Sequence, residues 1–210
     1  FNAAPGKLNL AALLSAIDRG LSLSQVGDAL DSTVVFIQEI IGDLSEANQV
    51  SLIMSHFGLV EGQSTGNDRK LVRDYFTERL KTGDSWGQIV YDAITYLSGN
   101  PDPRFAKAAV LLNNKALVAQ IYSQSYVEAN LNVLQHVLAG VSADDIFDQA
   151  AAEAYLESIG KPAGAVELTQ AKDVLNAHVF LAPRGYTPGG NDQINTLNDD
   201  DVLFGTLSSR

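Results

Sequence analysis

Apolar residues recur every three or four positions through most of the first 160 residues, which is the pattern of helices with one buried face. Each stripe before position 100 spans a few helical turns and is followed by polar or turn-forming residues. The stripes consist of Leu10, Leu13, Leu14 and Ile17; Val26, Leu30, Ile37 and Ile41; Val50, Ile53, Met54 and Phe57; Val72, Tyr75, Phe76 and Leu80; and Trp86, Ile89, Val90, Ala93, Ile94 and Leu97. The pattern predicts a mainly α fold, a multi-helix bundle.

The segment 100–103 reads Asn-Pro-Asp-Pro and interrupts this pattern, because the residue before a proline avoids the helical region of the backbone. Beyond it, the apolar stretch 105–122 predicts a long buried helix. Two further helices are expected at 131–138 and 146–159. The helical part of the chain therefore extends to about residue 160.

One short pattern occurs twice, 63 residues apart, as Gly20-Leu21-Ser22-Leu23-Ser24-Gln25-Val26 and as Gly83-Asp84-Ser85-Trp86-Gly87-Gln88-Ile89. In each copy, glycine can end one helix in the left-handed conformation. Serine can then cap the next helix, with glutamine at the N3 position of a capping box. We predict an internal helix-turn-helix duplication, with corners near 9–41 and 72–98. The alternative is coincidence, since capping boxes are common in helical proteins.

The pattern changes after about residue 162. Residues 186–192 are turn-forming, and 192–197 and 201–204 resemble short strands between Asp, Asn and Gly turns. We therefore place a domain boundary here, between a helical domain at 1–162 and a β/turn segment at 163–210. This second segment is expected to be the start of a truncated β-repeat region.

Composition narrows the possible partners. The chain has 14 Lys and Arg against 25 Asp and Glu, a formal net charge of -11, which argues against nucleic acid and anionic membrane surfaces. It has no cysteine, which excludes disulfides, thiol catalysis and thiolate zinc sites. A transmembrane helix needs ~20 consecutive apolar residues, and no apolar run in the sequence approaches that length. We therefore expect no membrane insertion. Because the chain begins at Phe1 and not at Met, we expect a processed product or an excised fragment, and the unfinished β-like pattern before Arg210 favours the fragment.

The acidic residues near the C-terminus are the best candidates for a metal site. Calcium prefers six to eight oxygen ligands, and oxygens are offered by Asp192, Asn198, Asp199, Asp200 and Asp201. The EF-hand pattern and the full Gly-Gly-x-Gly-x-Asp nonapeptide are both absent. The alternative, which we favour, is that these side chains cap turns through nearby backbone amides. Calcium thus remains a possible cofactor.

Catalytic patterns are missing from the sequence. There is no Gly-x-Ser-x-Gly elbow and no phosphate-binding glycine loop. The histidines His56, His136 and His178 form no pair at i, i+4, so we assign them to packing or to the surface. Asp144 and Asp145 fall where a helix is expected to begin, a position that favours carboxylates. Aromatic side chains that could stack on sugars fall mostly on apolar helix faces, where core packing is the favoured role: Trp86, Tyr91, Tyr96, Tyr122, Tyr126 and Tyr155. We expect no enzymatic activity.

The two Gly-x-Ser-x-x-Gln corners resemble a helical repeat domain of uncharacterised function found in bacterial S-layer-like and hemolysin-type (RTX-like) secreted proteins. Segments 111–122 and 137–144 resemble recurring stretches of the same proteins. The stretch from 168 to 206 resembles the entry into their β-repeat region, which implies strand and turn, not helix, at 166–180. One departure is the pair Leu13-Leu14, where the family has aromatic residues.

This resemblance implies type I secretion and a location outside the cell or on its surface. It also implies a non-catalytic structural or anchoring module of an S-layer-like or adhesin-like protein. The expected partners are a cell-envelope glycan or neighbouring copies in a self-assembly. Two alternatives stay open: a calcium-responsive binding module, and an accessory domain of a secreted hydrolase.

Overall fold

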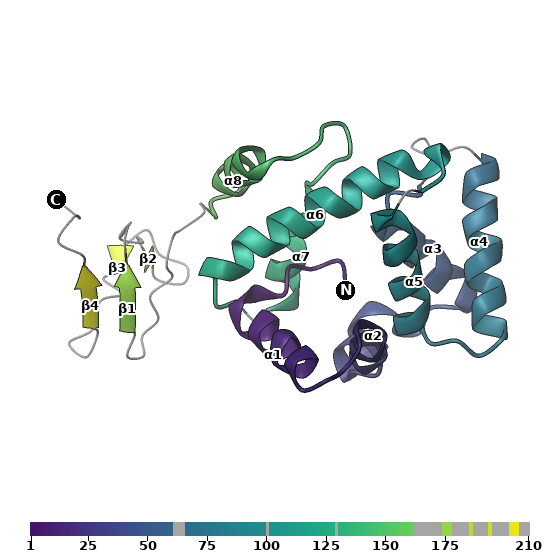
Figure 1. Cartoon of the computed structure of the whole chain (residues 1–210), viewed down its shortest axis with the longest axis horizontal. Helices are drawn as coiled ribbons and strands as arrows, with labels where there is room; N and C mark the ends of the chain where they lie inside the picture. Colours follow the sequence, from purple (N-terminus) through teal and green to yellow (C-terminus); the bar gives the residue numbers. More distant parts are fainter. Residues whose placement is uncertain are drawn as a thin grey trace.

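The chain is mainly helical, as the apolar pattern predicts (Figure 1). The computed structural model describes residues 1–60, 66–99, 101–128 and 130–161, and beyond them the backbone of four short strands. The helices are α1 (Gly6–Asp18), α2 (Leu23–Asp31), the π-helix η1 (Phe36–Ile40), α3 (Glu46–His56), α4 (Gly66–Lys81), α5 (Trp86–Ser98), the 3-10 helix η2 (Pro103–Phe105), α6 (Ala106–Ser125), α7 (Leu131–Ala139) and α8 (Gln149–Ser158).

Helix α6 is the axis of the helical part and crosses it diagonally in Figure 1. Its first residues join a hydrophobic cluster with α3, α4 and α5, built around Met54, Phe76 and Ile89. Its later turns carry a second cluster with α7 and α8, built around Tyr122 and Leu156. One helix therefore contributes side chains to both cores.

The N-terminal residues pack against the second cluster. Ala4 is fully buried, and its N–H donates to the Leu134 carbonyl at 3.0 Å. The N–H of Lys7 donates to the Tyr126 carbonyl at 2.8 Å. Gly6 has a positive φ of 70°, and a Cβ at this position would lie 2.6 Å from the carbonyl oxygen of Glu128. These contacts fix where α1 begins.

The local chemistry predicted for the two corners is confirmed in full at the first and in part at the second. Gly20 and Gly83 have φ of +98° and +92° and end their helices in the left-handed conformation. Ser22 and Gln25 form the full capping box, with hydrogen bonds of 2.9 and 3.2 Å. In the second corner only half of the box forms: Ser85 caps the helix, but Oε1 of Gln88 accepts the hydroxyl of Ser24, and its Nε2 donates to Asp92.

The two corners pack against each other, because α2 and α5 form the most extensive helix–helix contact among the described elements. They cross where Gly27 meets Gly87, at backbone-to-backbone distance. The carboxylate of Asp31 accepts the N–H of Gly87 at 2.8 Å, and that of Asp28 accepts the hydroxyl of Ser85. Each corner is therefore braced by the other, which sequence spacing alone does not show.

The stripe Val26, Leu30, Ile37 and Ile41 does not lie on one continuous helix. Helix α2 ends at Asp31, and a separate π-helix follows at Phe36–Ile40. The hydroxyl of Thr33 donates to the Leu30 carbonyl at 2.7 Å and accepts the N–H of Phe36 at 3.2 Å. Serine and threonine side chains thus compete with the helical backbone pattern at this position and interrupt it.

The last helix begins later than expected. It starts at Gln149, with Asp148 as the N-cap accepting the N–H of Ala151 at 2.8 Å. Asp144 and Asp145, expected at its first turn, lie instead in the preceding connection. The connection is irregular because α6 holds its backbone through Asn114, a contact between distant residues that a local pattern cannot predict.

Four short strands are described beyond residue 161: β1 (Val174–Ala177), β2 (Gly185–Tyr186), β3 (Gln193–Ile194) and β4 (Val202–Gly205). β1 pairs with β4 in parallel, with Val174 opposite Val202, and β2 pairs with β3 in antiparallel orientation. The rest of 163–210 lies outside the described residues. The domain boundary near residue 162 stays a prediction.

Candidate functional site

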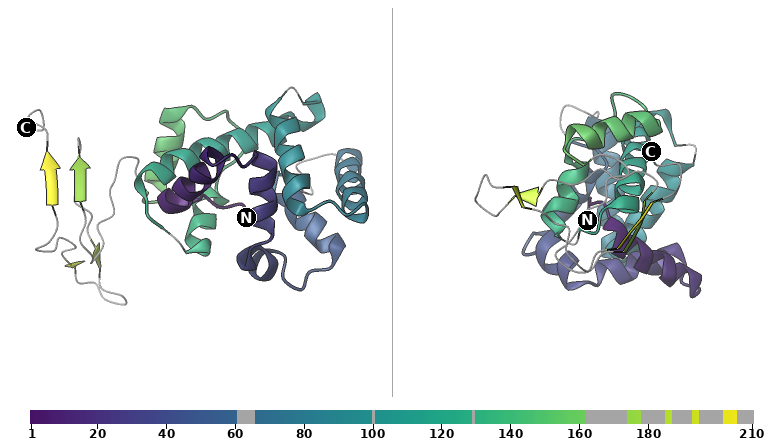
Figure 2. Two further views of the ribbon diagram at one scale, coloured as in Figure 1. Left: turned by 60° about the horizontal axis from the view of Figure 1, so that its bottom comes forward. Right: turned by 90° about the vertical axis from the view of Figure 1, so that its left-hand side faces the viewer.

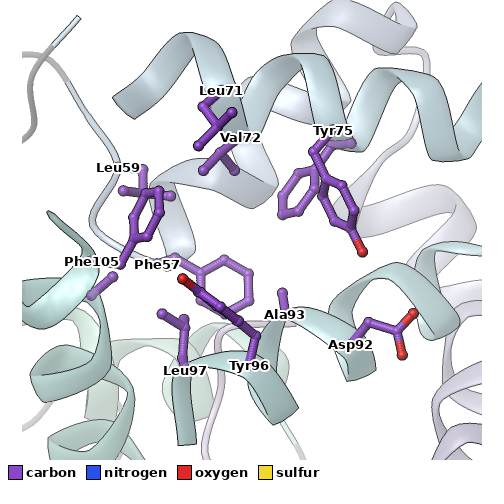
Figure 3. A pocket seen from close by; sticks show the side chains of 12 residues that line it. Phe57, Leu59, Leu71, Val72, Tyr75, Asp92, Ala93, Tyr96, Leu97 and Phe105 are labelled. Carbon is purple, nitrogen blue, oxygen red and sulfur yellow. The ribbon is translucent and has the colours of Figure 1, made fainter. Parts of the chain in front are cut away.

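The candidate site is an apolar pocket of about 370 Å³ between α4 and α5, here called the α4–α5 pocket (Figure 3). Helix α4 forms one wall and α5 the other, while the end of α3 and the start of α6 close the base. Its volume falls in the range of small-ligand sites. The lining residues are Phe57, Leu59, Leu71, Val72, Tyr75, Phe76, Asp92, Ala93, Tyr96, Leu97, Phe105 and Ala108.

A glycine turn places two of the lining residues. Helix α3 ends at His56, and Gly58 then adopts a positive φ of 73°. The N–H of Gly58 donates to the Ser55 carbonyl, and that of Leu59 to the Met54 carbonyl, at 2.9 and 3.1 Å. This is the hydrogen-bond pattern of a Schellman motif. The motif ends α3, turns the chain within two residues and places Leu59 at the base of the pocket.

Aromatic rings line much of the remaining wall. Tyr96 packs edge-on against Phe105, with ring centroids 6.2 Å apart, and Phe76 packs edge-on against Trp86 at 6.1 Å. Tyr75 and Tyr96 are 43% and 49% exposed, so their rings form the accessible rim. The hydroxyl of Tyr96 accepts the N–H of Asp102 at 2.9 Å, which holds the ring in place.

The polar edge of the pocket is already hydrogen-bonded. Asp92, the one carboxylate in the lining, accepts Nη2 of Arg79 and Nε2 of Gln88, each at 2.9 Å. Arg79 also donates to Asp84 and, at 2.5 Å, to the hydroxyl of Tyr75. The hydrogen bonds that Arg79 donates to Asp84 and then to Asp92 raise the pKa of Arg79 above its ordinary value. Asp92 is therefore held by two hydrogen-bond donors at the edge of a lining that is otherwise mainly apolar.

A second cavity, of about 300 Å³, lies between the start of α6 and residues 139–144. Its mouth is more polar, with Lys107 and Asp144 forming an exposed ion pair at 3.9 Å. Exposed pairs of this kind contribute little to stability. This cavity adds no group with reactive geometry.

The predicted calcium ligands cannot be placed against either cavity, because Asp192, Asn198, Asp199, Asp200 and Asp201 lie outside the described residues. Within the part of the chain that is described, no three acidic or histidine side chains come close enough to hold a metal ion. The same part contains no helix long and apolar enough to cross a membrane.

The aromatic residues considered for sugar stacking differ in burial, and two of them, Tyr91 and Tyr155, are partly buried. Trp86, Tyr122 and Tyr126 are buried, and the rings of the last two stack at 4.7 Å, which confirms core packing for them. Tyr96 instead reaches the pocket rim, and Tyr75, not considered from the sequence, joins it there. A tyrosine on a helix face with charged neighbours at 73, 74, 78 and 79 could have indicated this position.

The histidines differ in environment. His136 is exposed on α7, and His178 lies outside the described residues. His56 is partly buried beside Lys115, whose Nζ donates to the His56 carbonyl and to Oδ1 of Asn2, each at 2.8 Å. Burial, then the positive charges of the N-terminal amine and Lys115, lower the pKa of His56 from 6.5 to about 4.

The lowered pKa of His56 predicts that the folded chain becomes less stable in acid. The pKa of His56 is lower in the folded chain than in the unfolded chain, so the unfolded state takes up a proton first as the pH falls. The free energy of unfolding should therefore fall progressively as the pH is lowered from 6.5 to about 4. The expected loss is about 2 kcal/mol, because partial exposure of His56 weakens the effect. Urea unfolding across this range should show a flatter dependence for H56Q. H136Q is the control, and an equal slope for H56Q and the parent chain would refute the assignment.

No protein-family model, curated protein or solved structure matches the chain.

Proposed function

We propose that the chain is a non-catalytic structural or anchoring module of a secreted bacterial cell-surface protein, S-layer-like or adhesin-like. The observation that carries the proposal is the α4–α5 pocket, an accessible apolar concavity whose single carboxylate is already bound by Arg79 and Gln88. Such a lining favours docking of an apolar group over chemistry at a reactive side chain. The setting outside the cell comes from the sequence resemblance of the two corners.

The braced corners support a structural role. We infer that they arose by duplication, since both use a left-handed glycine followed by a serine cap. Their helices meet through glycine backbones and through carboxylates of Asp28 and Asp31 that bind the opposite corner. Tight, hydrogen-bonded packing of this kind favours a rigid body that holds its docking surfaces in fixed positions.

The pocket also bears on the choice between the two expected partners. A glycan presents many hydroxyls, which need hydrogen-bond partners when they are buried. The lining offers few: the Asp92 carboxylate is bound by Arg79 and Gln88, and the hydroxyls of Tyr75 and Tyr96 each accept one hydrogen bond already and add only an O–H donor. The pocket therefore fits an apolar protein side chain better than a sugar, and it favours the self-assembly or protein partner.

Cosedimentation of the purified chain with bacterial cell-envelope fragments tests the function. We expect binding to native fragments, retention after periodate oxidation of the glycans, and loss after protease treatment of the fragments. Substituting Leu71 with serine at the pocket should weaken binding at least about fivefold, a loss of ~1 kcal/mol. V34S, at an exposed apolar position outside the pocket, is the matched control. Absence of sedimentation with every preparation would contradict the anchoring function.

The calcium-responsive alternative rests on the five acidic-tail residues and is tested by repeating the sedimentation with millimolar calcium or with a chelator. If calcium orders this segment, binding and resistance of the tail to protease should both rise with the metal. Identical results in the two conditions would leave the structural module without calcium dependence.

A further inference from the structure

Helix α1 (Gly6–Asp18) is apolar on nearly all sides, yet Gly6 is its only buried residue. Leu8 is 62% exposed, Leu14 52% and Ile17 37%. A helix that is apolar all round is normally buried. Figure 2 shows α1 at the edge of the helical part, and its described contacts are with α6 and α2. A large part of its surface is therefore available to a partner.

The charged side chains at the two ends of α1 have the opposite sign to the one that the helix dipole favours. Lys7 lies in the first turn, where an anion would be favoured, and Asp18 lies in the last turn, where a cation would be favoured. Both residues are exposed, and neither side chain has an ion-pair or hydrogen-bond partner among the described residues. These charges therefore do not serve the stability of the isolated helix.

The same charges fit a second copy of the helix. Lys7, Ala11, Leu14 and Asp18 follow one another at spacings of four, three and four residues, which places them in one stripe. The stripe is symmetric about the middle of α1. In an antiparallel pair of such helices, Lys7 of each copy lies opposite Asp18 of the other, and Ala11 lies opposite Leu14.

We propose that α1 is a homodimerisation helix, which pairs antiparallel with α1 of a second copy of this chain through the stripe Lys7, Ala11, Leu14 and Asp18. Isologous contacts of this kind close a twofold dimer. Alanine at the centre permits close approach of the two axes, about 8 Å. Leu8 and Ile17 lie on the two sides of the stripe, where the second helix covers them.

Charge favours a second copy as the occupant. The chain carries a net charge of -11, which opposes self-association over most surfaces. On the stripe, however, one cation and one anion balance, and twofold symmetry turns them into two reciprocal ion pairs. This inference adds to the proposed structural function a second docking surface, separate from the α4–α5 pocket, and it rests on that function for its setting.

The contact is small. One helix face buries less than the roughly 800 Å² per partner of a standard stable interface. We therefore expect a dissociation constant on the order of 100 µM for the free chain. Where copies are held close together on a surface, a high effective concentration makes such a weak contact sufficient.

Sedimentation-velocity centrifugation over about 5 to 500 µM chain measures this constant. L14E should weaken dimerisation at least about tenfold, and K7E or D18K alone should weaken it about three- to tenfold. The double variant K7E/D18K should return to within about twofold of the parent chain, because the reciprocal pairs are restored with reversed sign. I146S, at an exposed position outside α1, is the control and should change nothing.

The single charge reversals separate dimerisation from folding. Each one improves the match with the helix dipole, so thermal melting of K7E and D18K should not fall. A monomer at the highest concentration, or a double variant as weak as the single ones, overturns the inference. A chain that stays monomeric but still sediments with envelope fragments overturns only this inference and leaves the proposed function standing.

Discussion

Gly87→Ala should lower the free energy of unfolding by at least about 3 kcal/mol, the largest effect expected of any single methyl group in this chain. A Cβ at residue 87 would lie 2.2 Å from the carbonyl carbon of Gly27 and 2.5 Å from the amide nitrogen of Asp28. Both atoms are backbone, so neither can rotate away and the two helices must separate. Separation would also break the hydrogen bond from Gly87 to Asp31.

Two other glycines provide a graded control, with urea unfolding followed by circular dichroism. Gly27→Ala places its Cβ 2.9 Å from the Gly87 carbonyl oxygen, a milder conflict, and should cost about 1 to 2 kcal/mol. Gly66→Ala meets nothing within 4 Å and should be neutral or slightly stabilising, since alanine favours helix. Equal stability of all three variants would show that α2 and α5 do not cross at these glycines.

Asn114→Ala should cost about 3 kcal/mol, because it removes three hydrogen bonds from one buried side chain. Nδ2 of Asn114 donates to the carbonyls of Ser142 and Asp145 at 2.9 and 2.7 Å, and Oδ1 accepts the N–H of Phe147 at 2.9 Å. The connection between α7 and α8 has no regular structure of its own over these residues. In the variant, the carbonyls of Ser142 and Asp145 and the N–H of Phe147 lose the side chain that bonds them.

Asn113→Ala is the matched control, since this residue is an exposed neighbour on the same helix. Its unfolding free energy should stay within about 0.5 kcal/mol of the parent chain. Hydrogen exchange should locate the damage in Asn114→Ala, with faster exchange at 141–148 and unchanged exchange in α5. Uniform acceleration throughout the helical part would contradict the local role assigned to Asn114.

The features that the sequence predicts well are those set by neighbouring residues. Glycine in the left-handed conformation and serine caps depend on a few consecutive positions, so the corners at Gly20 and Gly83 can be located from the sequence alone. The apolar stripes likewise predict most helices, because a repeat of 3.6 residues fixes which side chains share a face. Even so, the side chain of Gln88 departs from its predicted role, because its Oε1 accepts the hydroxyl of Ser24 from the other corner in place of the Ser85 N–H.

Features set by distant residues could not be predicted in this way. The stripe of α1 resembles that of a core helix, yet Leu14 is half exposed, because α6 and α2 are the main described elements packed against this helix and leave this face open. The α4–α5 pocket depends on how closely two helices approach each other, which periodicity does not encode. The crossing of Gly27 and Gly87 joins two positions that are not equivalent in the repeat, so aligning the copies gives no sign of it.

The docking of the N-terminal residues has a consequence for how the chain reaches this fold. Ala4 and Lys7 donate hydrogen bonds to residues 134 and 126, so this contact closes a loop of more than a hundred residues. Closing so long a loop costs about 4 kcal/mol of chain entropy, and contacts of high sequence separation slow folding. The N-terminal end therefore cannot settle first. It can dock only after α6 and α7 have formed and can receive it.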